Sequence, residues 1–133
     1  MAIILDADVI IGGERGTFDL QGWLAARGDE QFEIAAITVA ELWHGVERAS
    51  IPYRVVRESF LRALLSSLPI IPYTEQTAYH HTRLWAQIES SGKMIGPYDQ
   101  IVAATALERG SEIATFNKRH FSKVPQLKLV EFT

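Results

Sequence analysis

Short runs rich in Ile, Val and Phe alternate with helical patterns along this 133-residue chain, and this alternation constrains its fold more than any other feature. The runs fall at residues 3–5, 32–37, 68–72, 112–116 and 127–132. Most are separated by segments with helical periodicity. Because parallel strands need crossover helices, the order predicts an α/β fold of three layers, with a mainly parallel central sheet flanked by helices.

Three of the expected helices have recognisable boundaries. Pro52 suits the first turn of a helix that reaches Leu65. Thr74 can cap a helix that ends before Gly92, and a strongly apolar helix is expected over residues 98–109. The first of these helices should turn an apolar stripe toward the core, made of Val56, Phe60, Leu64 and Leu65.

Composition favours one globular domain over residues 1–133, because no linker, repeat or low-complexity segment divides the chain. Cysteine is absent, which excludes disulfides and thiolate zinc sites and fits a cytoplasmic protein. The apolar start is short, lacks a basic leader and carries acids, so it is a poor signal peptide or membrane span. We therefore expect no membrane association.

Charge argues against nucleic acid as a partner unless metal ions take part. Lys and Arg total 13 against 16 Asp and Glu, a formal net charge of −3. Proteins that bind nucleic acid through phosphate neutralisation alone are usually basic. Local help could come from a small basic set that is otherwise solvated surface: Arg48, Lys118, Arg119, His120 and Lys123.

Acidic and amide side chains follow the expected strands or open the helices behind them. Asp6 and Asp8 come directly after the first strand, and Asn117 follows the fourth. Glu41 and Asp99 stand in the expected first turns of two later helices. Because strand ends and helix starts meet at one rim of a doubly wound sheet, these five side chains are expected to converge.

Capping offers a purely structural explanation for most of these residues. Glu41 would complete a Thr-x-x-Glu capping box, and Asp99 would be favoured by the helix dipole. Asp8 and Asn117 would cap the short helical segments expected after them. Asp6 fits capping least well, because Asp8 is better placed for that role.

Convergence of Asp6, Glu41 and Asp99 would raise the pKa of at least one of them, unless a cation lies between them. Carboxylate ligands without cysteine favour Mg²⁺ or Mn²⁺, which bind hard oxygen donors. Such an ion lowers the pKa of bound water and screens a phosphodiester from the acids, which allows in-line attack at phosphorus. An acidic protein could then still act on RNA.

Four segments occur in an order that carries a family resemblance: residues 3–10 (IILDADVI), 38–45 (TVAELWHG), 98–106 (YDQIVAATA) and 114–121 (ATFNKRHF). They resemble the motifs of PIN-domain nucleases, and most closely those of the VapC-type toxins of type II toxin–antitoxin systems. The resemblance covers nearly the whole chain. It implies the PIN form of the three-layer fold.

By this resemblance Asp6, Glu41 and Asp99 would bind the Mg²⁺ or Mn²⁺ ion, with Asn117 at a fourth, more variable active-site position. Two residues depart from the family pattern, since Asp8 stands where Asn is frequent and Asn117 where Asp is frequent. Asp8 could join the ligands or add to their repulsion. Asn117 would hold a second ion less firmly, so one firmly bound ion is expected and a second is left open.

The resemblance further implies an endoribonuclease that acts as the toxin of a VapBC-type pair. Its partners would be an RNA substrate, a cognate VapB-type antitoxin that inserts a segment into the groove, and a second copy in a homodimer. The apolar stripe around Phe60, Leu61 and Leu64 is a candidate surface for one of the protein partners, or else plain core. A PIN-domain nuclease that processes RNA without a toxin role is an alternative.

A haloacid dehalogenase-like phosphatase is the alternative from a different class, because residues 6–9 also fit its D-x-D-x-[TV] opening. Asp6 would then be the nucleophile and Asp8 the general acid or base. That chemistry needs a late pair of acids for Mg²⁺. Asp99 is the only aspartate after Asp29, and it has no acidic neighbour.

Overall fold

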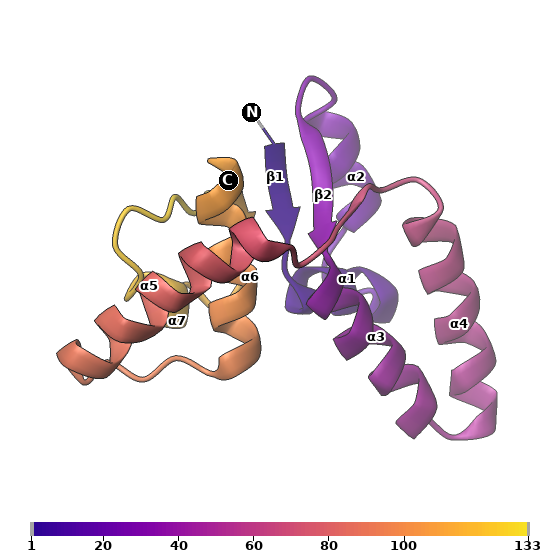
Figure 1. Cartoon of the computed structure of the whole chain (residues 1–133). Coiled ribbons are helices and arrows are strands. Elements are labelled where there is room, and N and C mark those ends of the chain that lie inside the picture. Colours follow the sequence, from indigo (N-terminus) through magenta and orange to yellow (C-terminus); the bar gives the residue numbers. More distant parts are fainter. Residues whose placement is uncertain (1, 133) are drawn as a thin grey trace.

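Parallel strands form the centre of the protein, which a computed structural model describes over residues 2–132. Met1 and Thr133, the two ends of the expected domain, lie outside the described residues. The sheet has the order β3-β2-β1-β4, made of β1 (Ala2–Leu5), β2 (Gln31–Ala35), β3 (Ile70–Ile71) and β4 (Glu112–Ala114). Figure 1 shows helices on both sides of β1 and β2. The expected α/β fold with a parallel central sheet is confirmed.

Helices make up most of the remaining described chain: α1 (Ala7–Arg15), α2 (Leu20–Ala26), α3 (Ala36–Arg48), α4 (Ile51–Leu65), α5 (Glu75–Ser91), α6 (Pro97–Arg109) and α7 (Lys118–Phe121). The boundaries expected for α4, α5 and α6 are confirmed to within a residue. α2 was not expected, because seven residues are too few to establish a helical period. Within residues 2–132, no helix is both long and apolar enough to cross a membrane.

β1 is buried on both faces of the sheet, because successive side chains of a strand point to opposite sides. Ile3 and Leu5 pack in a cluster with residues of α1, α2, α3 and α4. Ile4 packs in a second cluster with α5, α6 and α7, which includes the fully buried Phe121. The apolar run at the start of the chain is therefore continuous, and it stops at the residue where the strand ends.

Several expected strand boundaries are wrong. The second strand ends at Ala35 rather than residue 37, the third is only Ile70–Ile71, and the fourth stops at Ala114. Residues 127–132 contribute a single bridge, from Leu129 to Ile113, instead of a strand. The β-propensity of these segments predicted strands that are too long. A residue counts as part of a strand only where a neighbouring strand pairs with it, and these neighbours are short.

The capping box expected at residues 38–41 is also wrong. α3 begins at Ala36, and its cap residue Ala35 has no side-chain bond to the helix. Thr38 is fully buried within the helix, and Glu41 lies in its second turn. The capping explanation for Glu41 is thereby removed.

The apolar stripe of α4 is core rather than a docking surface. Leu61 and Leu64 are 4% and 6% exposed, and Phe60 packs against the same cluster. Val56, which was expected to face the core, is exposed instead. The exposed apolar residues of α4 lie in its first half: Ile51, Tyr53, Val55 and Val56.

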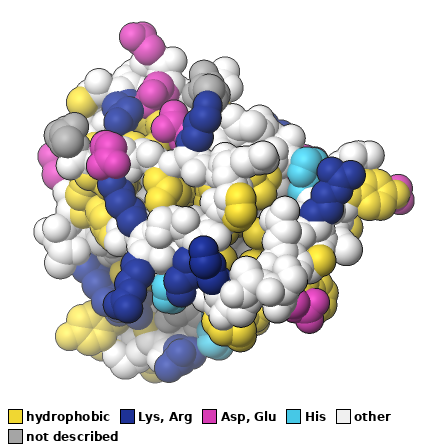
Figure 2. Space-filling model, turned by 90° about the vertical axis from the view of Figure 1, so that its left-hand side faces the viewer, with side chains coloured by type: hydrophobic (Ala, Val, Ile, Leu, Met, Phe, Trp, Pro, Cys, Tyr) yellow, Lys and Arg dark blue, Asp and Glu magenta, His cyan; other side chains and the backbone are white. Residues whose placement is uncertain are grey.

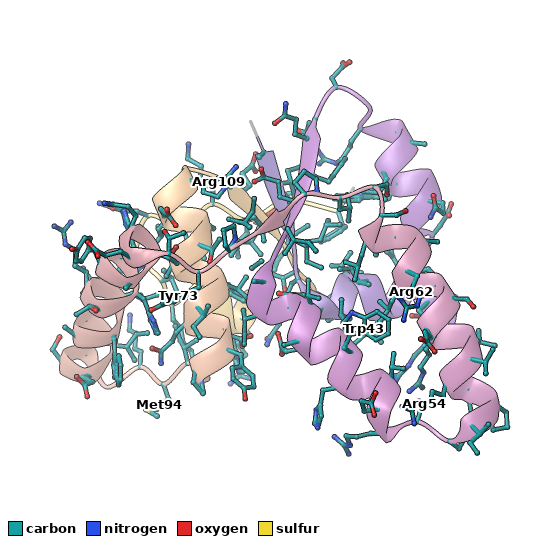
Figure 3. The ribbon with its side chains drawn as sticks, turned by 45° about the vertical axis from the view of Figure 1, so that its right-hand side comes forward. Trp43, Arg54, Arg62, Tyr73, Met94 and Arg109 are labelled. Atoms are coloured by element: carbon teal, nitrogen blue, oxygen red, sulfur yellow. The ribbon has the colours of Figure 1, made fainter. Side chains whose placement is uncertain are left out.

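A bidentate ion pair between Arg109 and Glu33 links α6 to the sheet. Arg109, labelled at the end of α6 in Figure 3, donates from Nε to Glu33 Oε1 at 3.0 Å and from Nη2 to Oε2 at 2.6 Å. The side chain of Glu33 is 7% exposed and that of Arg109 is 37% exposed. Removal of Arg109 would leave a buried carboxylate without its partner, which is costly.

We expect Arg109→Ala to lower the free energy of unfolding by about 1–3 kcal/mol, less than for a fully buried pair because Arg109 is partly hydrated. Arg54→Ala is the matched control, since Arg54 pairs with Glu47 at the surface and its loss should cost about 0–1 kcal/mol. Urea unfolding of both variants measures the difference. Equal losses would contradict a special contribution of the pair between Arg109 and Glu33.

Candidate active site

Asp6 follows β1 at the point where the strand order of the sheet reverses. β1 lies between β2 and β4, so the chain builds one half of the sheet before it returns to the other side of β1. In open parallel sheets, ligands bind in the crevice at the carboxyl ends of the strands at such a switch point. Figure 1 shows α1 and α3 beginning where the arrows of β1 and β2 end.

Asp6 is buried, with 6% of its surface exposed, and it caps α1. Its Oδ1 accepts the N–H of Ala7 at 2.9 Å, and its Oδ2 accepts the hydroxyl of Thr115 at 2.8 Å. The expectation that Asp8 rather than Asp6 caps this helix is wrong, because the helix starts two residues earlier than expected. Burial, followed by repulsion from Asp8, raises the pKa of Asp6 to about 6.

Thr115 joins two of the acids, although the sequence analysis gave it no role. It is fully buried, and its hydroxyl lies 2.8 Å from Asp6 Oδ2 and 3.4 Å from Asp8 Oδ2. Asp8 also accepts the N–H of Phe116, at 3.2 Å through Oδ2. Burial raises the pKa of Asp8 despite these hydrogen bonds. The only signal for Thr115 was its place in the strand-end segment that contains Asn117.

Glu41 points toward the same acids from the second turn of α3. Its Oε1 is buried and has no hydrogen-bond partner among the described residues. Burial, with repulsion from Asp6 and Asp99, raises the pKa of Glu41 to about 7. A buried carboxylate oxygen without a donor is unfavourable in the ionised state, and a cation would relieve it.

Asp99 lies in the first turn of α6, as expected. Its charge contributes to the raised pKa values of Asp6, Asp8 and Glu41, so the four carboxyl groups lie within electrostatic reach of one another. The convergence of Asp6, Glu41 and Asp99 on a single ion stays a prediction.

Asn117 is connected to this group of acids by His120 of α7, which contacts both Asn117 and Asp99. Its Nδ2 lies 2.9 Å from His120 Nδ1, and the same ring nitrogen lies 3.5 Å from Asp99 Oδ2. Asn117 precedes α7 but makes no side-chain capping bond, so capping does not explain it. His120 was expected only as general positive charge, whereas the structure places it between an amide and an acid.

The donor set fits a hard divalent cation. Among residues 2–132, no group of three or more His, Asp or Glu side chains is arranged to hold a metal ion by itself. Mg²⁺ commonly keeps several waters and takes only one or two carboxylates directly, so a finished cage of protein ligands is not required. Buried oxygens on Asp6 and Glu41, one of them unpaired, are suitable donors for such an ion.

Open space adjoins Glu41 on two sides. A groove of about 380 Å³ is lined by Ile37, Ala40 and His44 of α3 and by Tyr98 of α6. A smaller pocket of about 80 Å³ lies between α1, α3 and α4. Both spaces are lined in part by Glu41, and the first is the larger of the two.

Comparisons with known proteins agree on one family. Residues 3–127 match the family model described as PIN domain. The chain is 31% identical to tRNA(fMet)-specific endonuclease VapC of Salmonella typhimurium, over 74% of either protein. It is 34% identical to Ribonuclease VapC10 of Mycobacterium tuberculosis, over 95% of this chain and 90% of the relative.

Solved structures support the same grouping. The chain superposes on the crystal structure of DNA-bound VapBC from Salmonella typhimurium with a TM-score of 0.88 at 26% identity, covering 98% and 97% of the two chains. Nucleases with this domain are metal-dependent in general, which agrees with the carboxylate donors found here.

Stability of the metal-free protein should fall as the pH rises from about 4 to about 7. Asp6 and Glu41 have pKa values of about 6 and 7 in the folded protein, against 3.8 and 4.5 as ordinary values. The folded state therefore holds protons that the unfolded chain has lost across this window, and stability decreases as they dissociate. Urea unfolding in chelator at several pH values measures the trend.

Asp6→Asn should remove part of this dependence. Asparagine keeps the acceptor for the N–H of Ala7, its amide can donate to the hydroxyl of Thr115, and it carries no charge, so we expect the variant to be more stable than wild type at pH 8 by about 1–3 kcal/mol. The gain should shrink as the pH approaches 4. Asp19→Asn, which caps α2 instead, serves as control. A loss of stability at every pH would contradict the repulsion and favour a capping role alone.

Proposed function

The chain belongs to the PIN-domain family and, within it, to the VapC-type ribonucleases, and on this premise we propose that it is a metal-dependent endoribonuclease. Asp6, Glu41 and Asp99 would hold one Mg²⁺ or Mn²⁺ ion at the rim of the sheet. The observation that carries this assignment is the buried, unpaired Oε1 of Glu41 beside a second buried carboxylate. In a binding module without nuclease activity, this unpaired carboxylate would lower stability without serving a catalytic role.

A divalent ion held by Asp6, Glu41 and Asp99 would supply a water of lowered pKa and positive charge for the phosphodiester. Thr115 donates a hydrogen bond to Asp6 Oδ2 and so holds that carboxylate in place, while the ring of His120 lies 3.5 Å from Asp99 Oδ2. The open space beside Glu41 would let an RNA strand approach the acids.

We assign the direct ligand role to Asp6, Glu41 and Asp99, which the family resemblance implies, and we assign Asp8 to the electrostatics of the site. The oxygens of Asp8 accept the N–H of Phe116 and approach the hydroxyl of Thr115. Its charge adds to the repulsion at Asp6 that a cation would relieve.

We assign the protein to the toxin role of a VapBC-type pair in the cytoplasm. The VapBC complex from Salmonella typhimurium contains a chain of similar shape at 26% identity, which supports this assignment. A VapB-type antitoxin and a second copy of the chain would both need apolar surface. The exposed first half of α4, including Tyr53, Val55 and Val56, supplies such a surface.

The phosphatase alternative lacks the metal site that its chemistry needs. It requires a late pair of acids for Mg²⁺, whereas Asp99 is the only aspartate after Asp29 in the sequence. Residues 3–127 match the PIN domain instead. RNA processing without a toxin role uses the same site, so only a biological readout separates it from the toxin assignment.

Purified protein should cleave RNA in Mg²⁺ or Mn²⁺ and lose this activity in excess chelator. Asp99→Asn should reduce the cleavage rate by at least about 100-fold, because it removes a charge that the cation and its water require. Asp29→Asn is the matched control, since Asp29 is exposed in the turn before β2. Cleavage assays on a labelled RNA measure both variants.

Full activity in chelator, or equal activity of Asp99→Asn and wild type, would contradict the metal-dependent mechanism. Circular dichroism of Asp99→Asn should match wild type, which separates a chemical defect from a folding defect.

Induced expression should arrest bacterial growth, and Asp99→Asn should abolish the arrest. Expression of the antitoxin candidate from a neighbouring small gene should restore growth to cells that make the wild-type protein. Growth curves with matched expression levels provide the measurement. Arrest by Asp99→Asn as strong as that by wild type would show that toxicity does not depend on the nuclease site.

A further inference from the structure

The backbone of Phe116 lies beside the acids, and its aromatic ring is exposed. Its N–H is bonded to the carboxylate of Asp8, and the residue follows Thr115, which contacts Asp6. Nevertheless 47% of Phe116 is exposed. Exposure of a large ring loses part of the free energy that its burial would give, so this position has an apolar surface that the fold itself does not use.

The buried part of the ring is held firmly. Phe18 meets it edge to face with ring centroids 5.1 Å apart, and Phe132 lies at 4.9 Å. The exposed face is therefore presented by a ring whose position is fixed in advance, which lowers the entropic cost of stacking another group on it.

Positive charge adjoins this ring although the protein as a whole is acidic. Arg119 is exposed in α7, three residues after Phe116 along the chain. Lys118 and Lys123 lie in or just after the same helix, where Lys118 pairs with Glu131 and Lys123 donates to the carbonyl of Met94. Figure 2 shows Lys and Arg side chains, with histidines, gathered on the side of the molecule that carries α7. An aromatic ring beside basic residues is the combination that binds single-stranded nucleic acid.

We propose that Phe116 is a base-stacking site for the RNA substrate, which takes an unpaired base close to the phosphodiester at the acids. This inference rests on the proposed function and deepens it. A phenyl ring has no hydrogen-bonding group for a base edge, so it selects for an accessible base face rather than for sequence. Bases inside a duplex cannot offer that face, and the site therefore favours single-stranded segments or loops.

Two substitutions separate stacking from packing. Phe116→Leu keeps apolar contact with Phe18 and Phe132 but removes the aromatic face, whereas Phe116→Trp keeps an aromatic face. We expect Phe116→Leu to raise KM for a short unstructured RNA by about 10-fold to 100-fold with kcat changed by less than about 3-fold. Phe116→Trp should keep KM near that of wild type. Tyr79→Ala removes an exposed aromatic ring on α5 and should change neither constant.

Abasic nucleotides supply the second measurement. The same RNA is prepared with one base removed at successive positions around the cleavage site, and its binding is measured with Ca²⁺ in place of Mg²⁺ to prevent turnover. Removal of the base at one position should lower the affinity of the wild-type protein but not that of Phe116→Leu, because the base contributes to binding only when the aromatic ring is there to stack on it. A ring that only supports the fold would give the same abasic profile in both proteins.

The inference is overturned if Phe116→Leu binds and cleaves the RNA as wild type does, or if its abasic profile is unchanged. Normal RNA kinetics combined with a loss of antitoxin binding would assign the ring to the protein partner and overturn it as well. These outcomes leave an active ribonuclease and so spare the proposed function. A wild-type protein that neither binds nor cleaves RNA would instead overturn the proposed function and this inference with it.

Discussion

Buried carboxylate oxygens on Asp6 and Glu41 lie near the rim of the sheet, and the free energy of ionising them there is the constraint on which the rest of the structure depends. Asp6 is placed at this rim by a strand that is buried on both faces, so it cannot move toward water without loosening β1. Glu41 is held by α3 with one oxygen unpaired. Protons relieve this charge at low pH, and a divalent cation can relieve it at neutral pH.

The same constraint explains how an acidic protein can act on an acidic polymer. Negative charge is concentrated where the cation would bind, while the surface near α7 carries Lys118, Arg119 and Lys123. A phosphodiester approaching from the groove beside Glu41 would meet the cation rather than bare carboxylates. Neutral contacts, such as the exposed ring of Phe116, can then add affinity without adding charge.

The sequence predicted the fold class and the acidic rim for physical reasons, and it failed where tertiary contacts decide. Asp6 and Asp99 were placed correctly because strand ends and helix starts are local signals. The predicted start of α3 was wrong because Thr38 and Glu41 have the spacing of a capping box. In the structure Thr38 is buried inside the helix instead. Thr115 was missed because nothing local marks a threonine that bridges two acids from another part of the chain.

Metal binding coupled to proton release tests the central claim most directly. Asp6 and Glu41, with pKa values of about 6 and 7, hold protons at pH 6 that a bound cation must displace. Titration with Mn²⁺ in buffers of different ionisation enthalpy counts those protons by calorimetry. The account predicts release of about one proton per ion at pH 6 and almost none at pH 8. Binding without proton release at pH 6, or no binding at either pH, would contradict it.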